Sequence, residues 1–373
     1  MKKNLFSLVL TVLLVFAITS VGVSQEKITK SFNVKKGENL SVKVSGDVKV
    51  ESWSKDEVYI EVVGLNVDDA EDLKMKYEGN TVSVVLKNRD GASFSIKTPE
   101  QFNLDIKTSG GDILCLGKFV GNITGTTAGG DVKVPSVNGN VVLTTAGGDV
   151  STGDVSGEVK LTTAGGDIHA GTIGGEAKIS TAGGDIIVNS ASKTITLSTA
   201  GGDIKINNVG GEVKASTSGG DISVGTVKGA AKLNTSGGDI KLSGASGSIS
   251  TNTSGGDIKL EKLYGSVKAN TSGGEVYVEL TPDGSDESGL ASSGGNIKLL
   301  IPENAKATIE AVIEINSKKD LKTYKVISDF KFDSYVTDDD DREIRTTINL
   351  GGGGKLIKLN TVNSNIEIKK LGK

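Results

Sequence analysis

An aspartate recurs at a fixed spacing through the middle of the chain, and it is the residue best placed to do chemistry. Each copy follows Gly-Gly, and after a first interval of nineteen residues the interval is eighteen. Stacked carboxylates repel one another, and a bound Ca²⁺ ion would relieve that repulsion. The members of this aspartate column are Asp112, Asp131, Asp149, Asp167, Asp185, Asp203, Asp221, Asp239 and Asp257.

Calcium binding competes with a purely structural role for these carboxylates. Ca²⁺ takes about six to eight oxygen ligands, whereas each repeat supplies one acid and lacks the second glycine spacing of calcium-binding nonapeptide repeats. We therefore expect each aspartate to accept backbone N–H groups at its own turn. The run Asp338 to Asp341 is a second acidic candidate, but it lacks the glycine and terminal glutamate of an EF-hand loop. Calcium at either place remains the alternative.

Other catalytic groups are scarce. His169 is the one histidine and occupies an outward repeat position, which argues against a serine triad or a histidine metal cluster. Cys115 is the one cysteine, and its apolar neighbours favour a small buried hydrophobe. A β-helical polysaccharide lyase or hydrolase would need grouped acids with arginines or aromatics in a cleft, and the central repeats have almost no aromatics and no arginine. The sequence predicts no enzyme activity, no catalytic residue, no bound metal and no cofactor.

The repeats also predict the elements that hold the aspartates. Val or Ile follows every aspartate of the column, and apolar residues alternate with polar ones in two short stretches of each repeat. Glycines between these stretches supply corners, where positive φ or close backbone approach is needed. The predicted fold class is all-β: a single-stranded parallel β-solenoid (β-helix) with 18-residue coils and divergent capping ends.

Alternation separates outward from inward side chains. Positions two and eleven residues after each aspartate are mostly Lys, Ser or Thr and should form solvent-facing columns. The threonine four residues before each aspartate shares the parity of the apolar positions, so its hydroxyl should point inward and be satisfied along the stack. Its outward neighbour drifts from Thr126 through Ser180 to Asn234, which argues against a uniform ice-binding face.

The ends of the chain differ from its middle. A basic start, an apolar run over 5–17 and small residues up to Ser24 predict a secretory signal peptide, with a retained membrane anchor as the alternative. A short helix from Asp68 to Met75 could cover the open end of the solenoid. The predicted segments are the signal peptide (1–24), divergent N-terminal coils that form a cap (25–107), regular repeats (108–280) and C-terminal coils (281–373) with a long loop over 318–343.

The composition of the chain bears on its core and on the classes of partner that it could bind. The chain has 51 glycines and 4% aromatics, which suits a narrow solenoid core better than a large globular one. Its formal charge is −4, and its 42 basic residues are almost all lysine. That surface is a poor match for nucleic acid.

Several motifs resemble one known family. They are the tandem Gly-Gly-Asp-Val/Ile repeats, Gly46-Asp47-Val48 with the following Trp53 and Asp56-Glu57-Val58, and the strand end Lys97-Thr98-Pro99. They resemble a bacterial family of candidate adhesins of unknown function, built from Gly-Gly-Asp β-strand repeats. The resemblance covers nearly the whole mature chain. It implies the β-strand architecture and brings no catalytic residues with it.

These features favour a secreted, non-catalytic repeat protein that presents a repetitive polar face for adhesion or cell-envelope interaction. Its partner would be a cell-surface or envelope component, either glycan or protein, and its location the cell surface, the extracellular space or the periplasm. A self-associating periplasmic scaffold is the second hypothesis. A polysaccharide-active β-helix enzyme is the third.

Overall fold

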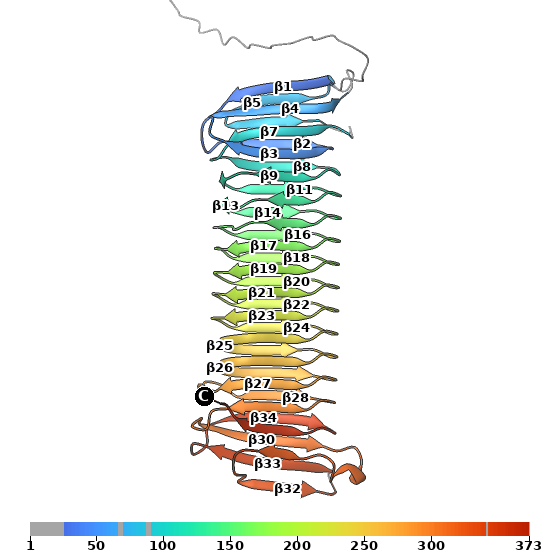
Figure 1. The fold of residues 1–373 in the computed structure, drawn as a ribbon, viewed down its shortest axis with the longest axis vertical. Helices are drawn as coiled ribbons and strands as arrows, with labels where there is room; N and C mark the ends of the chain where they lie inside the picture. Colours follow the sequence, from blue (N-terminus) through green and yellow to red (C-terminus); the bar gives the residue numbers. More distant parts are fainter. Residues whose placement is uncertain (1–25, 66–69, 87–90, 341, 373) are drawn as a thin grey trace, which may run out of the picture.

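The computed structural model describes residues 26–65, 70–86, 91–340 and 342–372. Within them the chain forms 35 strands and one 3₁₀-helix, η1 (Lys318–Asp320). Thirty-three of the strands belong to one continuous hydrogen-bonded sheet, wound into an elongated rod (Figure 1). The prediction of an all-β, solenoid-like fold is confirmed.

Two predictions for the N-terminal part concern segments that lie wholly or partly outside the described residues. The signal peptide predicted for 1–24 lies outside them. The helix predicted from Asp68 to Met75 lies partly outside them, and its last two residues already belong to strand β5 (Lys74–Glu78). Across the described ranges, no helix has both the length and the apolar character needed to cross a bilayer.

Each regular repeat contributes two strands, and equivalent strands of successive repeats pair in parallel. Strand β14 (Val141–Thr144) pairs with β16 (Val159–Thr162) so that Val141 lies opposite Val159, eighteen residues later. The same register recurs from pair to pair, so each outward or inward position forms a straight column.

This pairing builds two stacks of strands around a shared core. The first stack contains β8 (Asn103–Thr108), β11 (Ile123–Thr126), β14, β16, β18 (Ala177–Ser180), β20 (Ile195–Ser198), β22 (Val213–Ser216) and β24 (Ala231–Asn234). The second contains β9 (Ile113–Leu116), β12 (Val132–Val134), β15 (Val150–Thr152), β17 (Ile168–Ile173), β19 (Ile186–Ala191), β21 (Ile204–Val209) and β23 (Ile222–Val227). The long strands β25 (Ile240–Asn252) and β26 (Ile258–Thr271) run through both stacks. A short pair, β10 (Phe119–Val120) and β13 (Val137–Asn138), lies apart from the main sheet.

The core is a narrow file of aliphatic side chains between the two stacks. In β16, Val159 and Leu161 are buried while Lys160 between them is exposed. The residue after each repeat aspartate is buried throughout, as at Ile168 and Ile186. Burying one such side chain contributes roughly 1.5–3 kcal/mol, so the stability of the rod grows coil by coil.

The first coil of the chain is inside the rod, not at its end. Strand β2 (Asn39–Val44) lies between β6 (Thr81–Val85) and β8. Strand β3 (Asp47–Trp53) lies between β7 (Ser93–Pro99) and β9. Parallel pairing on both sides thus fixes this coil.

Antiparallel strands close the N-terminal end. Strand β4 (Glu57–Leu65) pairs with β7 and with β1 (Glu26–Asn33), and β5 pairs with β6. The edge strand β5 carries Lys74 and Lys76, and β1 carries Lys27 and Lys30. Lysines on an edge disfavour pairing with another chain.

The C-terminal end repeats this arrangement. The last coil, β34 (Lys355–Val362) and β35 (Ile366–Lys370), is inserted between the coil of β28 (Ser288–Ser292) and β29 (Ile297–Ile301) and that of β30 (Ala307–Glu314) and β31 (Val326–Ser328). Strand β27 (Val276–Thr281) connects β26 to β29 in the second stack. Antiparallel strands β33 (Glu343–Leu350) and β32 (Ser334–Asp338) complete the end. The segment 318–343, expected as a loop, therefore contains η1, β31 and β32.

The second glycine of each Gly-Gly pair is required by close backbone approach. A Cβ added at Gly166 would overlap the Gly148 carbonyl oxygen and lie 2.5 Å from Asp149 Oδ1. At Gly165 the nearest atom, the Gly147 carbonyl oxygen, would be 3.1 Å away. Glycine is therefore required at these corners because there is no space for a side chain, and not because the backbone is left-handed.

We expect Gly166→Ala to destabilise the protein by about 1–3 kcal/mol, because the added carbon forces two coils apart. Gly165→Ala is the matched control and should cost clearly less. Urea unfolding followed by circular dichroism measures both. Equal losses in the two variants would contradict the packing argument.

Candidate functional site

The predicted aspartate column is a continuous hydrogen-bonded ladder along one corner of the rod. In each step the side-chain Oδ1 of one aspartate accepts the backbone N–H of the next, as Asp167 does from Asp185 at 2.8 Å. From Asp112 to Asp257 every step measures 2.7–2.8 Å. The carboxylates therefore bind the amide of the next coil, whereas the sequence suggested an amide of the same turn.

The ladder extends beyond the predicted column at both ends. Asp47 Oδ1 accepts the N–H of Asp112 at 2.9 Å, so the first coil of the chain joins the ladder. Near the C-terminus Asn296 Oδ1 accepts the N–H of Asn365, and Asn365 Oδ1 accepts that of Lys325. Sequence reasoning missed Asn365, although Thr361 precedes it by the four residues that separate threonine and aspartate in every regular repeat.

The threonine column lies inside the same corner. Thr181 Oγ1 donates to the Gly166 carbonyl at 2.9 Å and accepts the N–H of Gly184 at 3.3 Å. Each threonine thus links its own turn to the preceding coil. The other members are Thr127, Thr145, Thr163, Thr199, Thr217, Thr235, Thr253 and Thr271, all buried.

The corner shows no arrangement suited to metal chemistry. Through the described ranges, no group of three or more His, Cys, Asp or Glu side chains is placed to hold a metal ion. Of the acidic run, Asp341 is not among the described residues, while the Asp340 N–H donates to Asp338 Oδ1 and Lys318 Nζ lies 3.6 Å from Asp340 Oδ1. This segment forms its own turn and ion pair.

The remaining candidate groups are separated from one another. His169 is exposed in the second stack, beside a shallow hollow of about 280 Å³ that also borders Thr152 and Ile187. Cys115 is buried, and burial raises the pKa of its thiol to about 12. At neutral pH the thiol is protonated, so it is a poor nucleophile.

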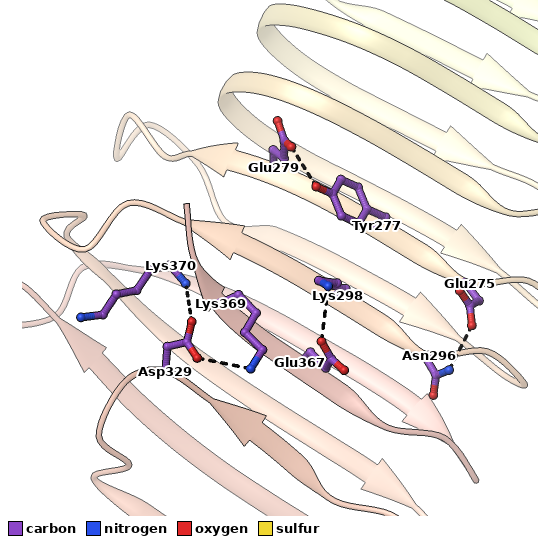
Figure 2. A network of polar contacts seen from close by, with 9 residues as sticks. All are labelled: Glu275, Tyr277, Glu279, Asn296, Lys298, Asp329, Glu367, Lys369 and Lys370. Carbon is purple, nitrogen blue, oxygen red and sulfur yellow. Dashed lines mark hydrogen bonds and ion pairs between the residues drawn. The ribbon is translucent and has the colours of Figure 1, made fainter. Parts of the chain in front are cut away.

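Polar contacts hold the last coils together near the C-terminus (Figure 2). The Tyr277 hydroxyl donates to Glu279 Oε1 at 2.8 Å, and burial together with this carboxylate raises the pKa of Tyr277 to about 12. Asp329 accepts the backbone N–H of Lys370 at 3.1 Å and the Lys369 ammonium at 3.2 Å, and both hydrogen bonds lower its pKa.

Two further contacts in the same region join successive coils. Lys298 Nζ lies 3.5 Å from Glu367 Oε2, and Asn296 Nδ2 donates to Glu275 Oε1 at 3.0 Å. Of these contacts, the Lys298–Glu367 pair and the two hydrogen bonds to Asp329 attach the inserted last coil to its neighbours.

The sequence profile of the family described as Toastrack DUF4097 matches residues 29–245 and 175–329. The chain belongs to the Toastrack family. No curated protein is significantly similar to it in sequence.

Three solved structures are similar to this Toastrack chain at low identity. A candidate adhesin from Bacteroides fragilis is 12% identical, covers 93% of this chain and 98% of its own, and has a TM-score of 0.23. A candidate lipid-binding protein from Parabacteroides distasonis is 17% identical, with coverages of 74% and 94% and a TM-score of 0.23. A candidate adhesin from the same species is 11% identical, with coverages of 74% and 98% and a TM-score of 0.24. The function of the chain is therefore argued from its own surface.

The first stack presents the most regular polar surface of this Toastrack protein. Lys160, Lys178, Lys214 and Lys232 project from one outward column, with Thr196 between the two pairs. Beside it, a second column changes from threonine through serine to asparagine. In its last part the Asn252 Nδ2 donates to Asn234 Oδ1 at 2.9 Å, and Asn270 Nδ2 donates to Asn252 Oδ1 at 3.0 Å. We call these two columns the polar face.

Asp185→Ala should destabilise the protein by about 1–2 kcal/mol, because the N–H of Asp203 loses a charge-assisted acceptor. Asp185→Asn keeps an oxygen at the same place and removes a stacked charge, so it should remain close to the wild type. Urea midpoints measure both changes. An asparagine variant as unstable as the alanine variant would show that the charge itself is needed.

Proposed function

We propose that this chain is an exported, non-catalytic module that uses its polar face to bind a component of the cell surface or envelope. The polar face is the observation that carries the proposal. Lys160 lies directly opposite Lys178, and Lys214 directly opposite Lys232. Like charges opposite one another on neighbouring strands lower the stability of a sheet. Of these four lysines, only Lys214 forms an ion pair among the described residues, with Glu212 at 3.2 Å. The pattern is therefore better explained by a binding partner than by folding.

Because the polar face repeats from coil to coil, weak contacts at each coil are sufficient for binding. Each coil offers a lysine or hydroxyl group beside a second polar group at the strand spacing of roughly 4.8 Å. A polymer or repetitive protein surface could engage several coils at once, and linked weak contacts sum to a much higher overall affinity. The proposed partner is a glycan or protein of the envelope.

The proposal that the chain is exported rests on its N-terminal sequence. Lys2 and Lys3 precede the apolar run 5–17, and small residues follow it. This pattern is typical of a secretory signal peptide. We propose that the mature rod acts at the cell surface, in the extracellular space or in the periplasm.

The polar face can be tested by replacing Lys160, Lys178 and Lys232 together with serine. The matched control replaces Lys133, Lys205 and Lys241 of the second stack, which removes the same charge from another face. The mature proteins are sedimented with purified cell envelopes of the producing bacterium at physiological salt. We expect the first triple variant to lose at least about tenfold in affinity while the control binds like the wild type. Equal binding by both variants and the wild type would overturn the proposal.

A self-associating scaffold is the second candidate, and strand β32 favours it. This strand pairs only with β33 in the described structure, and its Tyr335 and Val336 are 45% and 54% exposed. An exposed apolar edge strand can pair with another chain.

Sedimentation velocity at micromolar concentration tests the scaffold directly. If it is correct, the mature protein should form large species that Val336→Lys disperses, because a lysine on the edge disfavours pairing. A wild type that sediments as a monomer would exclude this candidate.

A further inference from the structure

Between β26 and β28 the eighteen-residue spacing of the first stack is interrupted, beside a hollow in its surface. Through β25 and β26 the parallel partners are eighteen residues apart, but Lys268 of β26 lies opposite Gly289 of β28, twenty-one residues later. The extra residues form a loop between Thr281 and Ser288. Departures from an otherwise consistent pattern are where functional sites are expected.

Strand β28 causes the hollow because its outward positions carry almost no side chain. Its outward-facing positions are Gly289 and Ala291, both half-buried, which lie between Lys268 and Asn270 on one side and Lys358 and Asn360 on the other. Strands at this spacing place the two flanking strands roughly 10 Å apart. The resulting groove has a volume of about 570 Å³ and is bordered also by Asp286 and Glu287 of the loop. That volume lies within the range of small-ligand sites.

Glycine at position 289 is not needed by the backbone. An added Cβ would meet no atom within 4 Å, and Gly289 is not among the glycines with positive φ. A side chain could therefore continue the lysine column there at no steric cost. Its absence leaves the groove open.

The side chains around the groove carry charges of both signs. In the described structure, Lys268, Lys358, Asp286 and Glu287 form no ion pair with one another or with other residues. The asparagine ladder also ends here, because Ala291 follows Asn270 in the column, and among the described residues no side chain donates to Asn270 Oδ1. The groove thus offers ammonium donors together with carboxylate and amide acceptors.

This combination selects for a neutral ligand rich in hydroxyl groups. A purely anionic ligand would face two carboxylates and a cationic one two lysines, whereas sugar hydroxyls both donate and accept hydrogen bonds.

We propose that the groove between β26, β34 and the loop 282–287 binds a neutral oligosaccharide. The inference rests on the proposed envelope-binding function and names one ligand class for it. Lys268 and Lys358 donate to sugar hydroxyls, while Asn270, Asp286 and Glu287 accept from them. The repetitive polar face then provides avidity along the rod, and the groove provides recognition.

Isothermal titration calorimetry tests the proposal with mature protein and four neutral probes: chitotetraose, cellotetraose, maltotetraose and mannotetraose. We expect at least one to bind with a Kd below ~1 mM, and Gly289→Leu, which fills the groove, to weaken it at least about tenfold. Gly110→Leu is the matched control, because a Cβ at Gly110 also meets open space and lies far along the rod. This control should bind like the wild type.

Two results would overturn the proposal. One is that no neutral probe binds, or that only oligogalacturonate or inorganic phosphate does. The other is that Gly289→Leu binds the active probe like the wild type. If oligosaccharide binding fails while the Lys160, Lys178 and Lys232 variant still loses envelope binding, the groove assignment falls and the proposed function stands. If the groove binds sugar but that variant binds envelopes normally, the polar face falls instead.

Discussion

Close approach of successive backbones at the Gly-Gly-Asp corner is the constraint on which the rod depends. Gly166 has no room for a Cβ because the Gly148 carbonyl and the Asp149 carboxylate occupy that space. The same proximity lets Asp149 accept the N–H of Asp167 and lets Thr163 donate to the Gly148 carbonyl. Glycine, aspartate and threonine are thus three parts of one coil-to-coil connection. Without these side chains, the Asp167 N–H and the Gly148 carbonyl would lose the partners that join them to the neighbouring coil.

The same connection joins the first and last coils of the chain to the rod. The inserted first coil contributes Asp47, which accepts the N–H of Asp112, and the inserted last coil contributes Asn365, whose N–H donates to Asn296. Both terminal coils therefore use the same corner chemistry as the middle. Because each of these two coils is paired on both sides, opening either one breaks hydrogen bonds to two neighbouring coils. Antiparallel strands take the exposed positions, where lysines protect the N-terminal edge.

Much of the fold could be predicted because one repeat contains most of the information. The Val or Ile after each aspartate, the alternation around Lys160 and the spacing of eighteen suffice to predict parallel columns with a buried core. The order of the terminal coils could not be predicted, because parallel insertion of β2 or β34 depends on contacts between segments distant in sequence and carries no local pattern. The hydrogen-bond partners of the aspartates could not be predicted for the same reason, because each partner amide lies eighteen residues away, outside any local turn motif.

Whether a candidate site could be predicted also depended on whether its residues form a local pattern or come together from distant segments. The lysines of the polar face are visible in the sequence because they recur at one repeat position. The groove is not, because Gly289 matters only through its neighbours Lys268 and Lys358, and Lys358 comes from the inserted last coil. A perfectly regular rod offers the same surface at every coil and cannot specify where a partner begins. Insertion of β34 beside the side-chain-poor β28 creates a place that differs from the regular coils. In a repeat protein, a single irregularity of this kind converts a uniform surface into one with a defined binding position.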